Sequence, residues 1–405
     1  MADKAFVVEV LHGADEVAAP VWDALANPVD RSSGTREFPY NPFLRHAFYH
    51  SCEASGSATA STGWMPHHIA LKDEDTTIGL LPCYVKSHSQ GEYVFDHGWA
   101  DAFERAGGDY YPKLQAAVPF TPATGRRLLA GADATTQARQ ALLGKGLAEV
   151  CRRLDLSSAH LTFLEESEWK LLDGEGYLRR TDQQFHWCND GFATFDDFLA
   201  SLASRKRKAI RKERETALSG NGITIERLTG ADLTEAVWDD FFQFYIDTGS
   251  RKWGRPYLTR AFFSMIGESM ADDVLLVMAK RNGRYVAGAI NFVGSHTLYG
   301  RHWGCVEHHP CLHFEVCYYQ AIDYAIEHGL SRVEAGAQGA HKLARGYLPQ
   351  TTYSAHFVPN PSFRRAVDEY LTRERDAVAM ENAAIERHAP FKRDNDGRMV
   401  KRPAG

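Results

Sequence analysis

Three side chains that can exchange protons lie in the second half of the chain: His302, Glu315 and Glu334. Histidine titrates near neutral pH, so we predict that His302 is a general base or proton shuttle. Glu315 begins a predicted helix and Glu334 lies in a largely apolar strand, and both are further candidates for the base. Each residue also has a structural alternative: a hydrogen-bonded histidine, an acid that complements a helix dipole, and a carboxylate with a partner.

Cations and aromatic side chains surround these candidates. Lys342 and Arg345 are three residues apart in a short predicted helix, so they share a face and could clamp a phosphate or a carboxylate. The alternative is a pair of solvated cations. The other residues that we predict to bind substrate are Arg301, Trp303, His313 and His341, with Arg251, Lys252 and Trp253 over the pocket, and His97 and Tyr111 in the first half.

The segment His308-His-Pro-Cys-Leu-His313 is rich in residues that can bind metals. Its spacing matches no standard zinc pattern, and Pro310 interrupts any helix that would align the ligands. We therefore predict no metal site. The segment is better explained as a loop before a helix N-terminus at Phe314, where backbone N–H groups can face a phosphate.

The elements that position these residues occur twice along the chain. Each copy reads as three strands followed by a helix and a strand, with the three strands predicted at 67–72, 78–88 and 92–98, and again at 274–280, 286–296 and 298–304. The Ser-His pairs that end at His88 and His296 lie 208 residues apart. Helices at 138–154 and 316–328 lead to strands near Ser157 and Ser331, which lie 174 residues apart. The first copy thus carries an insertion of 34 residues, around 100–127.

This repeat predicts an α/β (α+β) protein with two fused domains, each a mixed, mostly antiparallel sheet flanked by helices. The alternative is that any two α/β halves contain such elements. The predicted divisions are a first domain at 1–190, a basic linking helix within 191–222, a second domain at 223–361, a C-terminal helix at 362–390 and a polar tail at 391–405.

Composition narrows the class of protein. The chain has 405 residues, 44% hydrophobic and 24% charged, with a formal net charge of −6, which argues against a protein dominated by nucleic-acid binding. One local exception is the run from Arg205 to Arg214, which holds seven cations in ten residues. It is either a solvated helix face or a docking site for anionic lipid, an acyl-carrier protein or tRNA phosphate.

No apolar stretch is long enough to span a membrane, and the N-terminus lacks the apolar region of a signal peptide. The seven cysteines include no C-x-x-C pair, so we expect reduced thiols. These observations predict a cytoplasmic protein, with peripheral association on the inner membrane face as an alternative.

Several long strings resemble one bacterial family, the FemAB-like predicted N-acyltransferases, over about residues 40–390. These strings are Asn41-Pro-Phe-Leu, Lys86-Ser-His-Ser-Gln-Gly-Glu-Tyr-Val-Phe-Asp, Tyr111-Pro-Lys-Leu-Gln, Val118-Pro-Phe-Thr-Pro, Ser204-Arg-Lys-Arg-Lys-Ala-Ile-Arg-Lys-Glu, Leu312-His-Phe-Glu-Val-Cys-Tyr-Tyr-Gln and Glu334-Ala-Gly-Ala-Gln-Gly-Ala-His-Lys-Leu-Ala-Arg-Gly-Tyr347. The resemblance implies two fused GNAT-like acyltransferase domains, with acceptor binding in the first and catalysis in the second.

Enzymes similar to this family include bacterial ceramide synthases. The resemblance therefore implies transfer of a fatty acyl group to the amine of a lipid-like acceptor, such as a sphingoid base. The co-substrate would be acyl-CoA or acyl-carrier phosphopantetheine, with no bound cofactor and no DNA partner. Because a free alkyl amine has a pKa of about 9–10, few molecules are neutral at pH 7, and a positioned base would help. The tetrahedral oxyanion requires an N–H donor or a cation.

The sequence departs from two broader patterns. It lacks the Q/R-x-x-G-x-G/A phosphate loop of ordinary GNAT enzymes, and Ala344 occupies the position of a lysine that Fem-type enzymes usually carry. The alternatives are Fem-type transfer from aminoacyl-tRNA to a cell-envelope precursor, and a GNAT module that binds without catalysis.

Overall fold

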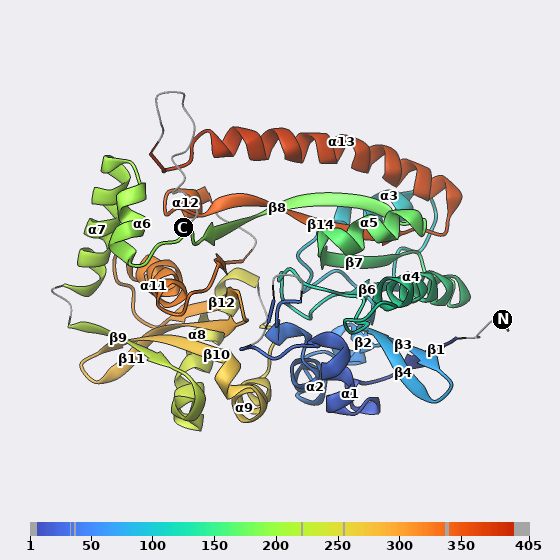
Figure 1. Cartoon of the computed structure of the whole chain (residues 1–405), viewed down its shortest axis with the longest axis horizontal. Helices are drawn as coiled ribbons and strands as arrows, with labels where there is room; N and C mark the ends of the chain where they lie inside the picture. The colour runs from blue at the N-terminus through green and yellow to red at the C-terminus, as the bar shows by residue number, and fades with distance from the viewer. Residues whose placement is uncertain are drawn as a thin grey trace. The chain divides into compact units, whose positions relative to one another are not determined.

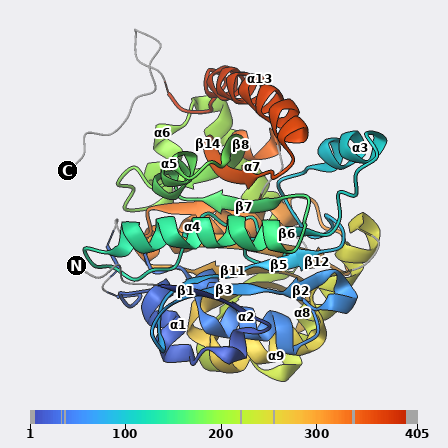
Figure 2. The ribbon, with the colours of Figure 1, turned by 90° about the vertical axis from the view of Figure 1, so that its right-hand side faces the viewer.

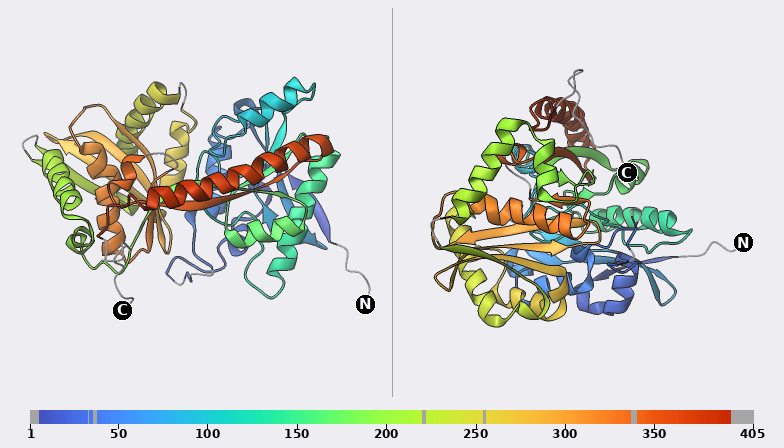
Figure 3. Two further views of the ribbon diagram at one scale, coloured as in Figure 1. Left: turned by 90° about the horizontal axis from the view of Figure 1, so that it is seen from above. Right: turned by 60° about the vertical axis from the view of Figure 1, so that its left-hand side comes forward.

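The computed structural model describes residues 6–32, 34–35, 38–219, 222–253, 256–336 and 340–392, without the side chains of 249–253 and 340. The chain forms two compact units (Figure 1): unit 1 comprises residues 1–182 and 351–380, and unit 2 comprises 183–350 and 381–405. The chain passes between them within β8 (Leu178–Cys188), near the start of β14 (Leu348–Phe357) and within α13 (Pro361–Glu386), which is one continuous helix (Figure 3).

Unit 1 contains two sheets. An antiparallel sheet has the order β1-β3-β4, and a mixed sheet has the order β2-β5-β6-β7-β14. The bounds are β1 Val7–Leu11, α1 Ala19–Ala26, α2 His46–Ala54, β2 Trp64–Pro66, β3 His68–Asp73, β4 Thr76–Leu81, β5 Tyr84–Lys86, α3 His97–Arg105, β6 Lys113–Ala116, α4 Thr136–Arg153, β7 Ala159–Leu164 and α5 Glu166–Gly174.

The two faces of the mixed sheet in unit 1 differ in chemistry. Leu114, Leu161 and Ala355 belong to an apolar cluster with Leu143 and Leu147 of α4, which lies along the sheet (Figure 2). Since side chains alternate between faces, the residues between them point to the opposite face, and those are polar. α4 connects β6 to the parallel strand β7.

Unit 2 repeats this strand–helix–strand arrangement with β12, α11 and β13, and its sheet has the order β8-β13-β12-β11-β10-β9. The bounds are α6 Phe195–Ser201, α7 Ser204–Leu218, β9 Ile223–Leu228, α8 Glu235–Trp253, α9 Arg260–Ser269, β10 Val274–Arg281, β11 Arg284–Val293, β12 Thr297–Cys305, α10 Leu312–Phe314, a π-helical turn Glu315–Tyr319, α11 Gln320–Glu327, β13 Arg332–Glu334 and α12 Ala340–Leu343.

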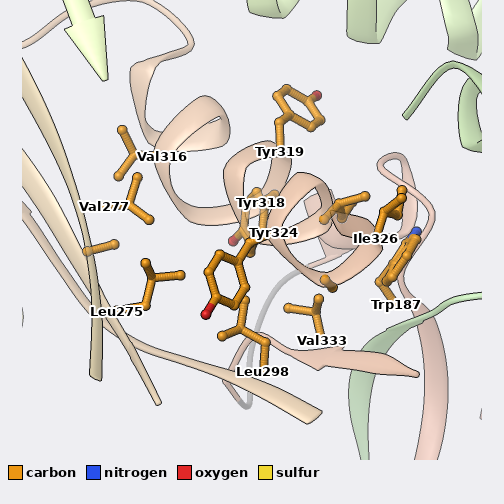
Figure 4. Close-up of a cluster of buried hydrophobic side chains, with 14 of the residues drawn as sticks. Trp187, Leu275, Val277, Leu298, Val316, Tyr318, Tyr319, Tyr324, Ile326 and Val333 are labelled. Carbon is orange, nitrogen blue, oxygen red and sulfur yellow. The ribbon is translucent and has the colours of Figure 1, made fainter. Parts of the chain in front are cut away.

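One face of the unit 2 sheet packs against α11. Leu298, Val333 and Trp187 belong to the same buried cluster as Tyr324 and Ile326 (Figure 4). α8 packs closely against β12, because a Cβ at Gly304 would lie 1.9 Å from the carbonyl oxygen of Phe244. Only glycine allows that approach. The core therefore fixes β12 through the helices that pack on it.

The fold class predicted from the sequence is confirmed: mixed sheets are flanked by helices in both units. The three strands predicted for the second copy match β10, β11 and β12. The strand predicted at 92–98 is wrong, because α3 begins at His97 and β6 supplies the strand that pairs with β7. The linking helix predicted within 191–222 is two helices, since Leu202 and Ala203 have extended backbones.

The compact units differ from the predicted divisions. Residues 351–380 belong to unit 1, because β14 pairs antiparallel with β7. This pairing joins segments far apart in the chain, which local periodicity does not reveal. The predicted tail lies largely outside the described residues.

Among the helices that the structure describes, none is long and apolar enough to cross a membrane.

Candidate active site

Two parallel strands separate at the centre of the unit 2 sheet. β12 and β13 pair only between Thr297–Tyr299 and Arg332–Glu334. β13 then ends, whereas β12 continues to Cys305, where β11 is its partner among the described strands. Backbone and side-chain groups beyond Gly300 are therefore released from the β13 ladder. Three of the predicted site residues, Arg301, His302 and Trp303, lie on this stretch.

A bulge interrupts β12 at these candidates. The register with β11 shifts between Ala289, opposite Trp303, and Asn291, opposite Gly300. Two residues, Arg301 and His302, thus occupy the place opposite the single residue Ile290. A bulge of this kind redirects side chains and increases local twist. It gives Arg301 and His302 orientations that regular alternation would not provide.

His302 is half-buried and lies edge-on to the ring of Tyr245, with centroids 4.9 Å apart. Burial, with the nearby charge of Arg301, lowers its pKa to about 3. The imidazole is therefore neutral at pH 7. Among the described residues, no hydrogen-bond partner is found for either ring nitrogen. His302 thus has a lone pair available to accept a proton from a ligand.

Lys342 lies in α12 and is 2% exposed. Its Nζ donates one hydrogen bond to the carbonyl of Gly336 at 2.7 Å. Burial and the positive charge of Arg301 lower its pKa to about 7. An ammonium group has three donors, so Lys342 retains donors for a ligand and can give up a proton near neutral pH.

Glu334 lies opposite Tyr299 of β12 and His186 of β8. Cross-strand partners share a face of the sheet, so these three side chains lie opposite the face covered by α11. Glu334 is 3% exposed and lies 3.5 Å from the Nε of Arg332. Burial, with Arg332 and Lys342, lowers the pKa of His186 to about 3. This polar group therefore carries two cations and one carboxylate beside a neutral imidazole.

Aromatic side chains form a second group next to β12. The ring of Trp303 lies 5.2 Å from His313, and His313 lies 5.4 Å from Tyr318. The hydroxyl of Tyr318 and Nε2 of His341 are 2.8 Å apart, within hydrogen-bond distance. The structure thus brings together three of the predicted substrate-binding residues, Trp303, His313 and His341.

Glu315 and Arg345 are instead engaged by α7. The Nε and Nη2 of Arg214 donate to the two oxygens of Glu315 at 3.1 and 2.9 Å. Arg345 donates to Glu213 at 3.1 and 2.9 Å and lies over the ring of Phe314. Both pairs are bidentate, which fixes geometry as well as charge. These contacts favour positioning roles for Glu315 and Arg345.

The remaining predicted residues lie elsewhere. Arg251, Lys252 and Trp253 end α8, but their side chains lie outside the described residues. His97 is exposed at the start of α3 and stacks on Phe95 at 5.9 Å. Tyr111 is half-buried, and its hydroxyl lies 2.7 Å from that of Ser89. His97 and Tyr111 belong to unit 1.

Tyr111 borders a buried polar network on the polar face of the unit 1 sheet. Lys113, fully buried, donates to Glu92 at 2.8 Å, to Ser89 at 2.9 Å and to Asp96. Although burial opposes ionisation, the Lys113 ammonium lowers the pKa of Asp96. In this network, the charged groups of Glu92 and Asp96 are both hydrogen-bonded to that of Lys113.

The same face carries a pair of histidines on adjacent strands. The Nδ1 atoms of His160 and His356 are 2.6 Å apart. Burial lowers the pKa of His160 to about 3 and lowers that of His356 as well. Both rings are therefore neutral at pH 7. The ring of Trp99 lies 4.9 Å from His356 and covers the pair.

Sequence reasoning missed Lys113, His160, His186 and His356. A signal was present, because polar residues occur at every second position in the strands that carry them: Tyr84 and Lys86, Lys113 and Gln115, His160 and Thr162, Gln184 and His186, Ser354 and His356. Such alternation predicts a polar sheet face. Nothing in the sequence indicates that this face is buried.

Comparisons with known proteins agree with this architecture. The model of the FemAB-like family, described as peptidoglycan biosynthesis/recognition, matches residues 13–393. The crystal structure of FemX is similar, with 12% identity, a TM-score of 0.51, and coverage of 89% of this chain and 100% of FemX. At that identity the likeness concerns the fold alone. No curated protein sequence gives a match.

Two further solved structures have lower scores. A tandem GNAT protein from the clavulanic acid biosynthesis pathway has 12% identity and a TM-score of 0.46, covering 88% of this chain and 99% of its own. L-PGS from Bacillus licheniformis has 10% identity and a TM-score of 0.48, covering 82% and 98%.

Proposed function

Since the chain belongs to the FemAB-like family, we propose that it is an N-acyltransferase of the GNAT kind with its chemistry in unit 2. It would move a fatty acyl group from a thioester carrier to the amine of a lipid-like acceptor. The observation that carries this proposal is the neutral His302, without a hydrogen-bond partner among the described residues, on the stretch of β12 that separates from β13.

Each group at this position has a task in the reaction. The neutral amine attacks the thioester carbonyl, a C–N bond forms and an oxyanion develops, which Arg301 and Lys342 stabilise as cations. His302 accepts the proton that the amine nitrogen loses. The C–S bond then breaks, and the thiolate takes a proton, for which Lys342 is the proposed donor. The products are an amide and a free thiol.

The carrier would be acyl-CoA or an acyl-carrier protein, and α7 is the proposed docking element. Arg205, Lys208 and Lys212 are exposed, and no ion-pair partner is found for them among the described residues. Clustered unpaired cations attract a polyanionic carrier or an anionic membrane surface. By contrast, Arg211 pairs with Asp196, and Arg214 with Glu315.

The same cations favour a second candidate function, Fem-type transfer from aminoacyl-tRNA to a cell-envelope precursor, because RNA phosphates would bind there. The amine chemistry at His302 would be unchanged. For the first candidate, a sphingoid base is the proposed acceptor, which would make the reaction a ceramide synthesis. Unit 1 is the proposed binding site for the acceptor in both cases.

An assay of thiol release separates these possibilities. Purified protein with long-chain acyl-CoA and a sphingoid base should release free CoA and form an amide. Absence of release with several chain lengths, and with acyl-carrier protein as donor, would contradict thioester chemistry. Activity that appears only with aminoacyl-tRNA and disappears with RNase would favour the second candidate. Substrate binding without any transfer would indicate a binding module.

A further inference from the structure

A cavity of about 650 Å³ lies in unit 1 between α3 and the first part of α13. Its volume falls in the range of about 300–1,000 Å³ that is typical of small-molecule sites. Its walls are largely apolar, and the large apolar residues that line it include Trp99, Phe103, Phe363 and Val367. All of them belong to unit 1.

Small residues create this space. α3 presents Gly98 and Ala102, four residues apart, and α13 presents Ser362 and Ala366, also four apart. Residues at this spacing share a helix face. A Cβ at Gly98 would meet no atom within 4 Å, so the volume beside α3 is open. Two helices with small facing residues could otherwise approach to direct contact.

Large aromatic residues keep the two helices apart. The rings of Phe103 and Phe363 are 4.5 Å apart, so these side chains brace one end of the cavity. At the inner wall, Trp99 is held against His356, 4.9 Å away. The space is therefore a constructed feature of unit 1 rather than a packing defect.

The cavity offers little to a polar ligand. Arg180 is the charged residue among its described walls, and its guanidinium is already occupied. It donates twice to Glu374 at 2.8 Å and once to the carbonyl of Phe95 at 2.9 Å. The charge of Arg180 is already paired with Glu374, so an anionic ligand group would compete with that carboxylate. The inserted part of a ligand should therefore be uncharged.

The shape and the rim indicate what that part is. Within the helices, the lining extends from Gly98 to Phe103 of α3 and from Ser362 to Tyr370 of α13, which corresponds to about 8–12 Å of helix length. Phe95 and Tyr370 are 47% and 44% exposed. Exposed aromatic rings beside an apolar cavity gain stability when an apolar ligand covers them.

We propose that this cavity binds the aliphatic chain of a single-headed lipid, with the head group outside in solvent. This inference goes beyond the transfer reaction and does not rest on it, because the site lies in unit 1 and is defined by binding. If the protein takes a lipid acceptor, the cavity would hold its chain.

The test measures binding of cis-parinaric acid, a fluorescent long-chain fatty acid, to the full-length protein. Wild-type protein should bind it saturably. Ala102→Trp and Ala366→Trp each add an indole at an exposed lining position, so both variants should fold. Excluding as few as two methylene groups weakens binding about ten-fold, which is the smallest loss we expect.

Ala377→Trp is the matched control, because Ala377 is exposed on α13 and does not line the cavity. It should bind like the wild type. Hexadecylamine and palmitate should both displace the probe, whereas free CoA should not. Unsaturable binding, equal affinity in the filled variants, or displacement by free CoA would overturn the proposal. Circular dichroism melting confirms that each variant is folded.

Discussion

His302 and Lys342 hold protonation states that differ from those of exposed residues of their types. The imidazole is neutral because burial and Arg301 disfavour its charge, and the ammonium titrates near pH 7 for the same two reasons. Residues with strongly shifted pKa values cluster at functional sites. The proposed reaction depends on both residues.

Substitution of His302 tests the base directly. His302→Ala should lower kcat by about 10²–10⁴ with little change in KM, because general-base catalysis typically contributes that much. Since the pKa is about 3, wild-type activity should show no loss on the acidic side near pH 6.5. Steady-state thiol release measures both quantities. His328→Ala, at an exposed histidine on the same unit, is the control and should behave like the wild type.

Lys342 should produce a limb on the alkaline side. If the Lys342 ammonium stabilises the oxyanion, activity should fall as the pH rises through about 7, because the ammonium then loses its proton. The fall is judged against a variant whose cation does not titrate in this range. Lys342→Arg should shift that limb upward, and Lys342→Met should lose about 10²–10³ in kcat. The ratio of variant to wild-type kcat at each pH cancels the titration of the acceptor amine. Identical pH profiles for wild type and Lys342→Arg would contradict the role.

Helix α7 combines two functions along one element. On its inner side, Arg214 binds Glu315 of the π-helical turn and Glu213 binds Arg345, which follows α12. Its exposed side carries cations. Glu315 is fully buried, and Arg214 is its ion-pair partner. The basic run from Arg205 to Arg214 therefore has two parts. Arg214 forms a structural ion pair, whereas the exposed cations form a candidate docking surface.

The structural side of α7 can be tested by stability. Arg214→Ala should lower the free energy of unfolding by about 3–5 kcal/mol, because it leaves the Glu315 carboxylate buried without its partner. Chemical denaturation measures this change. Arg211→Ala removes an exposed pair with Asp196 and should cost about 0–1 kcal/mol. Equal decreases in the free energy of unfolding of the two variants would show that the buried pair stabilises the protein no more than the exposed pair does.

The docking side of α7 can be tested by kinetics. Reversing the charges of Arg205, Lys208 and Lys212 to Glu should raise the KM for the donor and weaken its dependence on salt, with kcat retained. Ionic strength is varied at fixed acceptor concentration. Reversing three exposed cations elsewhere, Arg105, Arg365 and Arg373, to Glu makes the same change in net charge and is the control. An unchanged KM for the donor would contradict the docking role and indicate that these cations form a solvated helix face.

Buried neutral histidines set a property of the whole molecule. His160, His186 and His302 have pKa values of about 3 in the folded chain, and the pKa of His356 is also lowered. Unfolded histidine has a pKa of about 6.5, so below that pH the unfolded chain binds protons that the native chain does not. The free energy of unfolding must therefore fall as the pH falls from about 6.5.

We expect the thermal midpoint to decrease steadily from about pH 7 to pH 5, with each buried histidine contributing about 1.4 kcal/mol per pH unit. His356→Asn should make this decrease shallower, because it removes one proton of difference. Calorimetry at a series of pH values measures the slope. His97→Asn, at an exposed histidine, should leave the slope unchanged. A steeper decrease in His356→Asn would contradict the assignment.

The sequence by itself determined the local elements and their repetition. Alternation and turn residues located β10, β11 and β12, and with them the place of His302 on β12. The long strings that resemble the FemAB-like family agree with the family match. These features can be predicted because each depends on residues that are close together in the sequence. Over such short distances, the period of the apolar residues indicates which side of a strand or helix is buried.

Only the tertiary structure decided which residues meet. His160 and His356 are 196 positions apart, and Arg214 and Glu315 are 101 apart, yet each pair is in direct contact. Whether a polar side chain is buried, paired or free depends on the segment that covers it, which no local pattern specifies. For the same reason, the strand predicted at 92–98 is a loop and the start of α3 in the structure. The strand that pairs parallel with β7 is β6.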